Sequence, residues 1–198
     1  MPDFPSLTLR DLLDDLAAAD PAPGSGAVAA IVVAQAASLL AGAGRSSRES
    51  WAEAGGAVAQ ATMLRTRALD LAREVSDAYC HALTILDAPP GETAAERDAA
   101  IAEALSHAAE VPLAIARAAS DAASLGAAIA ERGDPATHGD VGAAVLLAEG
   151  AARAAASLVG INLTATPGDP RIVRAETLAD DARVAARRTL GERWHSLH

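Results

Sequence analysis

The sequence contains no lysine and very few aromatic residues. All 16 basic side chains are arginines, so Schiff-base chemistry and a lysine nucleophile are excluded. One Phe, one Tyr and two Trp are the only aromatic residues among 198. Aromatic and β-branched residues favour strands, and both are scarce here. The composition therefore argues against an all-β or α/β fold.

Cysteine and positive charge are also limited. Cys80 is the only cysteine, so an intramolecular disulfide is excluded, which fits a cytoplasmic protein. The net charge is −10 and there is no basic tract, which argues against a nucleic-acid partner. A few arginines can still hold a small anionic ligand. The first 15 residues are acidic rather than basic and do not resemble a secretory signal.

Alanine, in contrast, is abundant. The 54 alanines form helices at little cost in side-chain entropy. We therefore predict an all-α fold, with residues 1–198 forming a single-domain antiparallel helical bundle joined by short loops. Residues 21–44 carry no charge, and a helix there is either a membrane span or a buried central helix. Because this helix is mostly alanine and contains Gln35 and Ser38, we favour a long buried central helix and no membrane.

Turn residues and periodic apolar residues place the expected helices. Thr8 and Asp11 are spaced as a capping box, and so are Thr93 and Glu96. Pro112 suits either a kink or the first turn of a helix. The expected helices cover residues 8–20, 27–43, 49–86 with a possible kink at the glycine pair 55–56, 93–110, 112–132, 140–163 and 171–190.

One loop leads directly into the uncharged helix. It reads Pro23-Gly24-Ser25-Gly26. Free N–H groups at a helix start can hold an anion or a carbonyl oxygen, and glycines let a ligand approach the backbone. The same sequence is also compatible with a purely structural loop-to-helix turn.

A second helix start carries ionisable residues. Asp140 suits either an N-terminal capping role or a carboxylate directed into a pocket. His138 is either a solvated loop residue or a proton-transfer partner. Asn162 lies in the apolar run 158–163, where a buried amide needs hydrogen-bond partners, and it is a candidate for binding a ligand.

Two further clusters have simpler explanations. Asp77 and His81 are four residues apart and can meet on a helix surface, whereas Cys80 and His81 point about 100° apart and make a poor nucleophile–base pair. The residues Glu103, His107 and Glu110 have helical metal-ligand spacing, but such spacing is common on an acidic face. We expect no metal site.

In their order along the chain, several motifs resemble a known family. The segments are the loop 23–27, Val111-Pro112-Leu113, Asp140-Val141 and Gly160-Ile161-Asn162-Leu163. Together they are similar to the cyclodeaminase domain of formiminotransferase-cyclodeaminase and to the stand-alone methenyltetrahydrofolate cyclohydrolases. The resemblance covers nearly the whole chain.

This resemblance implies an all-α homodimer acting on a small-molecule substrate, a one-carbon derivative of tetrahydrofolate. Members close the formimino group with loss of ammonia, as lyases, or hydrolyse the methenyl group; no metal or redox cofactor is implied. Both reactions need proton transfer at a tetrahedral carbon.

The resemblance also suggests site residues. The loop 23–26 would bind the substrate near Tyr79, with Arg45 or Arg48 near its glutamate tail and Asp140 in the pocket. An ungapped reading puts Val75 at the family's catalytic aspartate, four residues before the aromatic Tyr79. A shifted register would place Asp77 there instead. Two alternatives remain: the same fold used for a non-folate cyclisation, dehydration or elimination, and a non-catalytic helical dimer that binds a ligand or partner.

Overall fold

A computed structural model of the chain describes residues 6–18, 24–86 and 94–194. The regular secondary structure in these ranges is helical, which confirms the predicted all-α class. The elements are α1 (Leu9–Ala17), α2 (Ser25–Ser46), the 3₁₀ helix η2 (Ser47–Glu49), α3 (Ala54–Leu86), α4 (Ala94–Ala108), α5 (Glu110–Arg132), the 3₁₀ helix η3 (Pro135–Thr137), α6 (His138–Asn162) and α7 (Pro170–Trp194).

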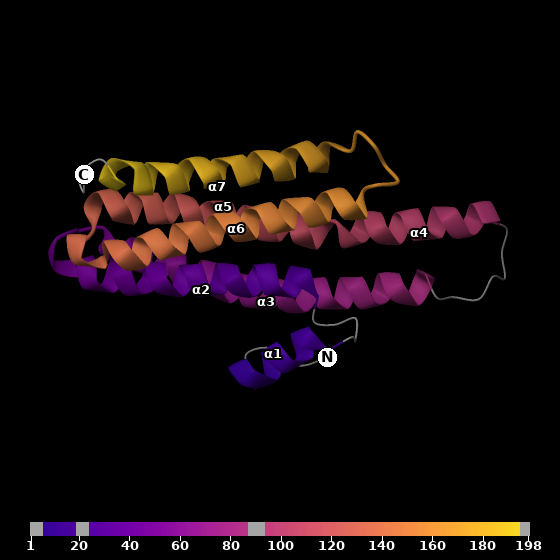
Figure 1. Cartoon of the computed structure of the whole chain (residues 1–198), viewed down its shortest axis with the longest axis horizontal. Helices are drawn as coiled ribbons and strands as arrows, with labels where there is room; N and C mark the ends of the chain where they lie inside the picture. Colours follow the sequence, from indigo (N-terminus) through magenta and orange to yellow (C-terminus); the bar gives the residue numbers. More distant parts are fainter. Residues whose placement is uncertain (1–5, 19–23, 87–93, 195–198) are drawn as a thin grey trace.

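Helices α2, α3, α5 and α6 form the body of the molecule (Figure 1). Helix α2 contacts α3 and α6, and α5 also contacts both of these, so the four helices close a bundle. Helix α7 packs along α5 and α6, while α4 lies beside α3. In Figure 1 the short helix α1 lies below the other helices; it has no buried residue, but its partly buried Leu12 packs against the core.

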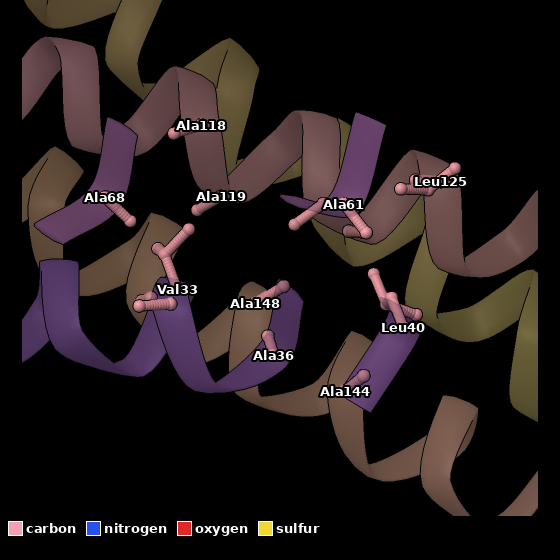
Figure 2. Packing of buried hydrophobic residues seen from close by; sticks show 14 of the residues in the cluster. Val33, Ala36, Leu40, Ala61, Ala68, Ala118, Ala119, Leu125, Ala144 and Ala148 are labelled. Carbon is pink, nitrogen blue, oxygen red and sulfur yellow. The ribbon is translucent and has the colours of Figure 1, made fainter. Parts of the chain in front are cut away.

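Small side chains fill the core of the bundle (Figure 2). Ala36 of α2 and Ala148 of α6 are both fully buried. Gly126 of α5 lies at a close approach to α6 and α2, because a Cβ atom there would collide with Val145 and lie 3.3 Å from Leu40 Cδ2. Alanine and glycine thus let the helix backbones approach closely, which suits a chain with few large side chains.

Several helix boundaries differ from the sequence-based expectation, and two of them involve glycines. The long helix begins at Ala54 rather than residue 49, because residues 47–49 form the 3₁₀ helix η2. Gly55 and Gly56 therefore lie in the first turn of α3 rather than at a kink within it. Gly44 does not end α2; it is buried against α3, where a Cβ atom would lie 2.9 Å from Val58 Cγ2.

Local signals predicted other boundaries correctly. Thr8 and Asp11 form the capping box of α1, and Pro112 lies in the first turn of α5. Gly133 caps α5 at its C-terminal end. The predicted capping residue Thr93 lies outside the described residues.

Two groups of polar contacts fix the ends of the bundle. The buried Ser47 hydroxyl donates to Ala43 O at 2.8 Å and accepts from the Asp134 N–H at 2.8 Å, which ties η2 to the link between α5 and α6. At the other end, Arg171 donates to Asp169 Oδ2 and Glu110 Oε1, both at 2.7 Å, and to Ser106 Oγ at 2.8 Å. These contacts join the start of α7 to the junction of α4 and α5.

Three segments are long and apolar enough to cross a membrane by length and composition: Ser25–Glu49, Glu96–Arg132 and Pro135–Asn162. In the bundle, 61%, 67% and 39% of their most apolar windows are buried against the rest of the chain. The segment containing α6 is thus the least covered of the three.

Candidate functional site

A cavity of about 220 Å³ lies at the start of α2. Its walls come from α2, α3, the α4–α5 junction and the end of α6. The residues around it are Gly24, Ser25, Gly26, Ala27, Val75, Ser76, Tyr79, Ala108, Pro112, Leu158, Ile161 and Asn162.

The N-terminus of α2 supplies backbone donors to this cavity. Ser25, Gly26 and Ala27 form its first turn, where N–H groups have no carbonyl one turn earlier to bond. Gly24 is the N-cap residue and makes no side-chain capping bond. The positive end of the helix dipole adds to these donors, so this wall favours a carbonyl oxygen or an anion.

Gly26 lets α3 approach this helix start closely. A Cβ atom on Gly26 would lie 2.6 Å from Val75 Cγ2, well inside van der Waals contact. Val75 is 8% exposed and forms an apolar wall. Val75, Ser76 and Tyr79 all line the cavity, so they share one side of α3.

Few polar side chains face the cavity. The Asn162 amide donates to Ala108 O at 3.2 Å, and this orientation leaves its side-chain oxygen as an acceptor. The buried Ser76 hydroxyl donates to Ala72 O at 3.1 Å. Tyr79 is 47% exposed at the opening. No Asp, Glu or His belongs to the described lining, so one chain supplies donors and apolar contact but no carboxylate.

The structure brings together five of the residues selected from the sequence. Gly24, Ser25, Gly26, Tyr79 and Asn162 all line this cavity, although they lie on three different helices or their starts. Pro23 precedes the described part of α2 and lies outside the described residues.

The other selected residues lie elsewhere. Arg45 and Arg48 are at the far end of α2, and His138 and Asp140 are at the start of α6. Because α6 rises 1.5 Å per residue, Asp140 is about 33 Å from Asn162 along this helix. A single chain therefore does not place the exposed Asp140 beside the glycine-rich loop.

Asp77 and His138 also have defined positions. Asp77 is exposed on α3 and does not line the cavity, unlike its neighbour Ser76. The His138 ring is hydrogen-bonded through Nε2 to Ala130 O at 3.0 Å.

Sequence reasoning did not select the apolar walls of the site. Leu158 and Ile161 are three residues apart on α6 and lie in the same apolar run as Asn162, which is the signal that could have identified them. Pro112 was noted as a helix-start residue and as part of a family motif but not as a wall of a site, and nothing in the sequence distinguishes Ala108 from the many other alanines.

The expectation of no metal site stays a prediction within the described ranges. They contain no group of three or more His, Cys, Asp or Glu residues arranged to hold an ion. Glu110, one of the helically spaced residues considered above, instead pairs with Arg171.

Comparison with known proteins identifies the family. The fold matches the crystal structure of formiminotetrahydrofolate cyclodeaminase from Thermotoga maritima with a TM-score of 0.82 and 22% identity, over 96% of this chain and 98% of that one. Among curated proteins, none matches this sequence significantly. The family model described as formiminotransferase-cyclodeaminase matches residues 8–177. This chain therefore belongs to the formiminotransferase-cyclodeaminase family.

Proposed function

We propose that this chain is a one-carbon folate enzyme, acting as a cyclodeaminase or as a methenyltetrahydrofolate cyclohydrolase. The observation that carries the proposal is the cavity at the start of α2, where the glycine-rich loop, Tyr79 and Asn162 meet in a member of this family. The similar Thermotoga protein is described as a formiminotetrahydrofolate cyclodeaminase.

The cavity suits the ring system of such a substrate. Its volume of about 220 Å³ is below the roughly 300–1,000 Å³ of pockets that enclose a whole drug-sized ligand. The bicyclic head would therefore lie inside and the glutamate tail outside. The free N–H groups at Ser25 and Gly26 would donate to the ring carbonyl, and the Asn162 oxygen would accept from a ring N–H.

The reaction needs a group that moves a proton. Ring closure with loss of ammonia and hydrolysis of a methenyl group both pass through a tetrahedral carbon, where a positioned acid or base accelerates the reaction. Asp140 and Asp77 are the carboxylates selected for this role from the sequence, and neither lines the cavity of a single chain.

One observation favours a second candidate function. Val75 stands at the position that the family resemblance gives to an aspartate, and it makes the α3 wall apolar. A non-folate cyclisation, dehydration or elimination would suit such a wall. The proposal further includes a homodimer in the cytoplasm that uses no metal or redox cofactor and binds no membrane.

Thermal unfolding with tetrahydrofolate derivatives tests the proposal. A ligand at 100 times its Kd stabilises the folded state by about 2.7 kcal/mol, which raises Tm by roughly 5–10 °C for a domain of this size. Tyr79→Ala should reduce this rise. Met63→Ala is the matched control, because Met63 is 73% exposed and lies about 24 Å away on the same helix.

Each outcome has a distinct meaning. A rise in Tm that Tyr79→Ala reduces and Met63→Ala leaves intact supports folate binding in this cavity. No rise at millimolar ligand contradicts it and favours the non-folate function. An equal rise in both variants means that folate binds elsewhere on the chain.

A further inference from the structure

The junction of α4 and α5 is a helical path with one backbone hydrogen bond missing. Ala109, between the two helices, keeps helical dihedrals of −74° and −21°, and α4 continues the line of α5 in Figure 1. In a continuous helix the N–H of residue 112 would donate to the carbonyl of Ala108, one turn earlier. Residue 112 is a proline and has no N–H. The Ala108 carbonyl therefore lacks its usual helical donor.

A side chain from another helix replaces this donor. Asn162, the last residue of α6, donates from its side-chain nitrogen to Ala108 O at 3.2 Å. No other residue in the described ranges donates to this carbonyl. Ala108 is only 7% exposed, so its carbonyl depends on a partner from the protein. The gap left by Pro112 is thus filled by Asn162.

This hydrogen bond fixes which way the Asn162 amide faces. A carbonyl oxygen only accepts, so the NH2 group of the amide must point towards Ala108. Turning the amide over would bring two oxygens together and leave the Ala108 carbonyl without a donor. Because a buried acceptor without a donor is costly, the amide has one favoured orientation.

The oxygen of the Asn162 side chain is available to a ligand. Within the described part of the chain no group donates to this oxygen, and it is not among the buried polar atoms without a partner. It is therefore accessible to solvent, and Asn162 lines the cavity. The start of α2 offers N–H donors to the same cavity. The site thus combines backbone donors with one acceptor of fixed orientation.

We infer that Pro112 is a positioning residue for this site: because it leaves Ala108 O to Asn162, it holds the Asn162 amide with its oxygen available in the cavity, and the site thereby selects ligands that present an N–H donor there. Together with the N–H groups of α2, this acceptor matches a lactam edge, in which a ring C=O stands next to a ring N–H. The positioning by Pro112 depends on the chain alone. The lactam selection rests on the proposed function, since the 4-oxo ring of a folate carries such an edge.

A ring with the reversed pattern should bind less well. In a 2,4-diamino ring, the nitrogen next to the amino group is an acceptor, and it would face the Asn162 oxygen without a shared proton. Loss of one buried hydrogen-bond partner weakens binding by about 5- to 150-fold. The 2-amino-4-oxo ring has nearly the same shape. It should therefore bind more tightly by about this factor at mildly alkaline pH, where both rings are neutral.

NMR of the Asn162 amide tests the positioning without any ligand. Asn162 is the only asparagine in the chain, so protein labelled with ¹⁵N-asparagine gives a single side-chain NH2 pair. In the wild type, the proton that points at Ala108 O should exchange with water more slowly than the other proton. In Pro112→Ala a new backbone N–H competes for Ala108 O, and this protection should be reduced or lost. Pro135→Ala is the matched control, because Pro135 begins η3 beyond the other end of α5.

Ligand affinity tests the selection. Calorimetry would compare 2-amino-4-oxotetrahydropteridine with its 2,4-diamino analogue on the wild type and on both proline variants. The ratio of the two Kd values should fall by at least about fivefold in Pro112→Ala, because the released amide can turn its NH2 group towards the diamino ring. A purely structural role of Pro112 would change both Kd values by the same factor. Pro135→Ala should keep the wild-type ratio.

Two results would overturn the inference. Equally fast exchange of both Asn162 side-chain protons in the wild type shows that the amide is not fixed, whether or not Pro112→Ala folds. An unchanged Kd ratio in folded Pro112→Ala shows that Pro112 does not act through Asn162. If neither ring binds the wild type, the proposed function and the lactam selection fail together, and the exchange result alone decides the positioning by Pro112.

Discussion

Substitution of Gly26 by alanine tests whether close packing of α2 on α3 shapes the site. The added Cβ atom would lie 2.6 Å from Val75 Cγ2 and 3.3 Å from Cγ1, whereas ordinary contacts are 3.4–4 Å. Either Val75 moves into the cavity or the two helices separate by several tenths of an ångström. Both responses change the wall of the proposed binding site.

The expected change in the free energy of unfolding of Gly26→Ala follows from two opposing effects. Overpacking a well-filled contact costs about 1–3 kcal/mol. Replacing a helical glycine by alanine returns up to about 1 kcal/mol, and less in the first turn. Gly26→Ala should therefore lower the free energy of unfolding by roughly 0.5–2 kcal/mol.

Gly55→Ala is the matched control. Gly55 is also the second residue of its helix, but nothing lies within 4 Å of an added Cβ atom. It should leave stability unchanged or raise it by up to about 1 kcal/mol. Urea unfolding, followed by circular dichroism at one protein concentration, measures the free energy of unfolding of both glycine variants.

A double-mutant cycle with Val75→Ala completes this test. If the collision causes the loss, removing the two methyl groups should relieve it, and the two substitutions should couple by about 1–2 kcal/mol. Additive effects, or the same shift for both glycine substitutions, would refute the reasoning.

Three other predictions concern single side chains. Hydrogen bonds from the Arg171 side chain lower the pKa of Asp169 to about 2. Since the unfolded value is about 3.9, the stabilisation is complete above pH 4 and is lost as pH falls to about 2. Asp169→Asn should therefore lower the urea midpoint at pH 6, and its difference from wild type should shrink by pH 2. Val75→Asp places a carboxylate beside the free N–H groups of α2 and should raise cyclohydrolase turnover at least about tenfold, whereas the neutral Val75→Asn should not. The buried Trp51 indole N–H has no partner among the described residues, so Trp51→Phe should change the free energy of unfolding by less than about 1 kcal/mol, against roughly 3–5 kcal/mol lost in Trp51→Ala.

The helical class could be predicted from composition because alanine dominates and strand formers are few. Capping signals placed some helix ends well, as at Thr8 and Gly133. Glycine was the main source of error. The helix expected to end at residue 43 continues through Gly44, which permits close contact with Val58; only the neighbouring helix distinguishes a glycine that ends a helix from one that packs within it.

The site could be predicted only in part. The loop before α2, Tyr79 and Asn162 were selected separately, on local sequence and family resemblance, and the fold brings them together. Asp140 was assigned to the same pocket, yet in one chain it lies at the other end of a helix of 25 residues. A linear sequence gives the length of a helix but not which end of a neighbouring helix it meets.

Hydrogen exchange with and without a tetrahydrofolate derivative tests the central claim most directly, because it reports where the ligand binds as well as whether it binds. The account predicts increased protection at residues 24–27, 75–79 and 158–162, with no change around Met63. Stabilisation by the ligand without protection of these three segments would contradict the assignment of the cavity at the start of α2 as the binding site.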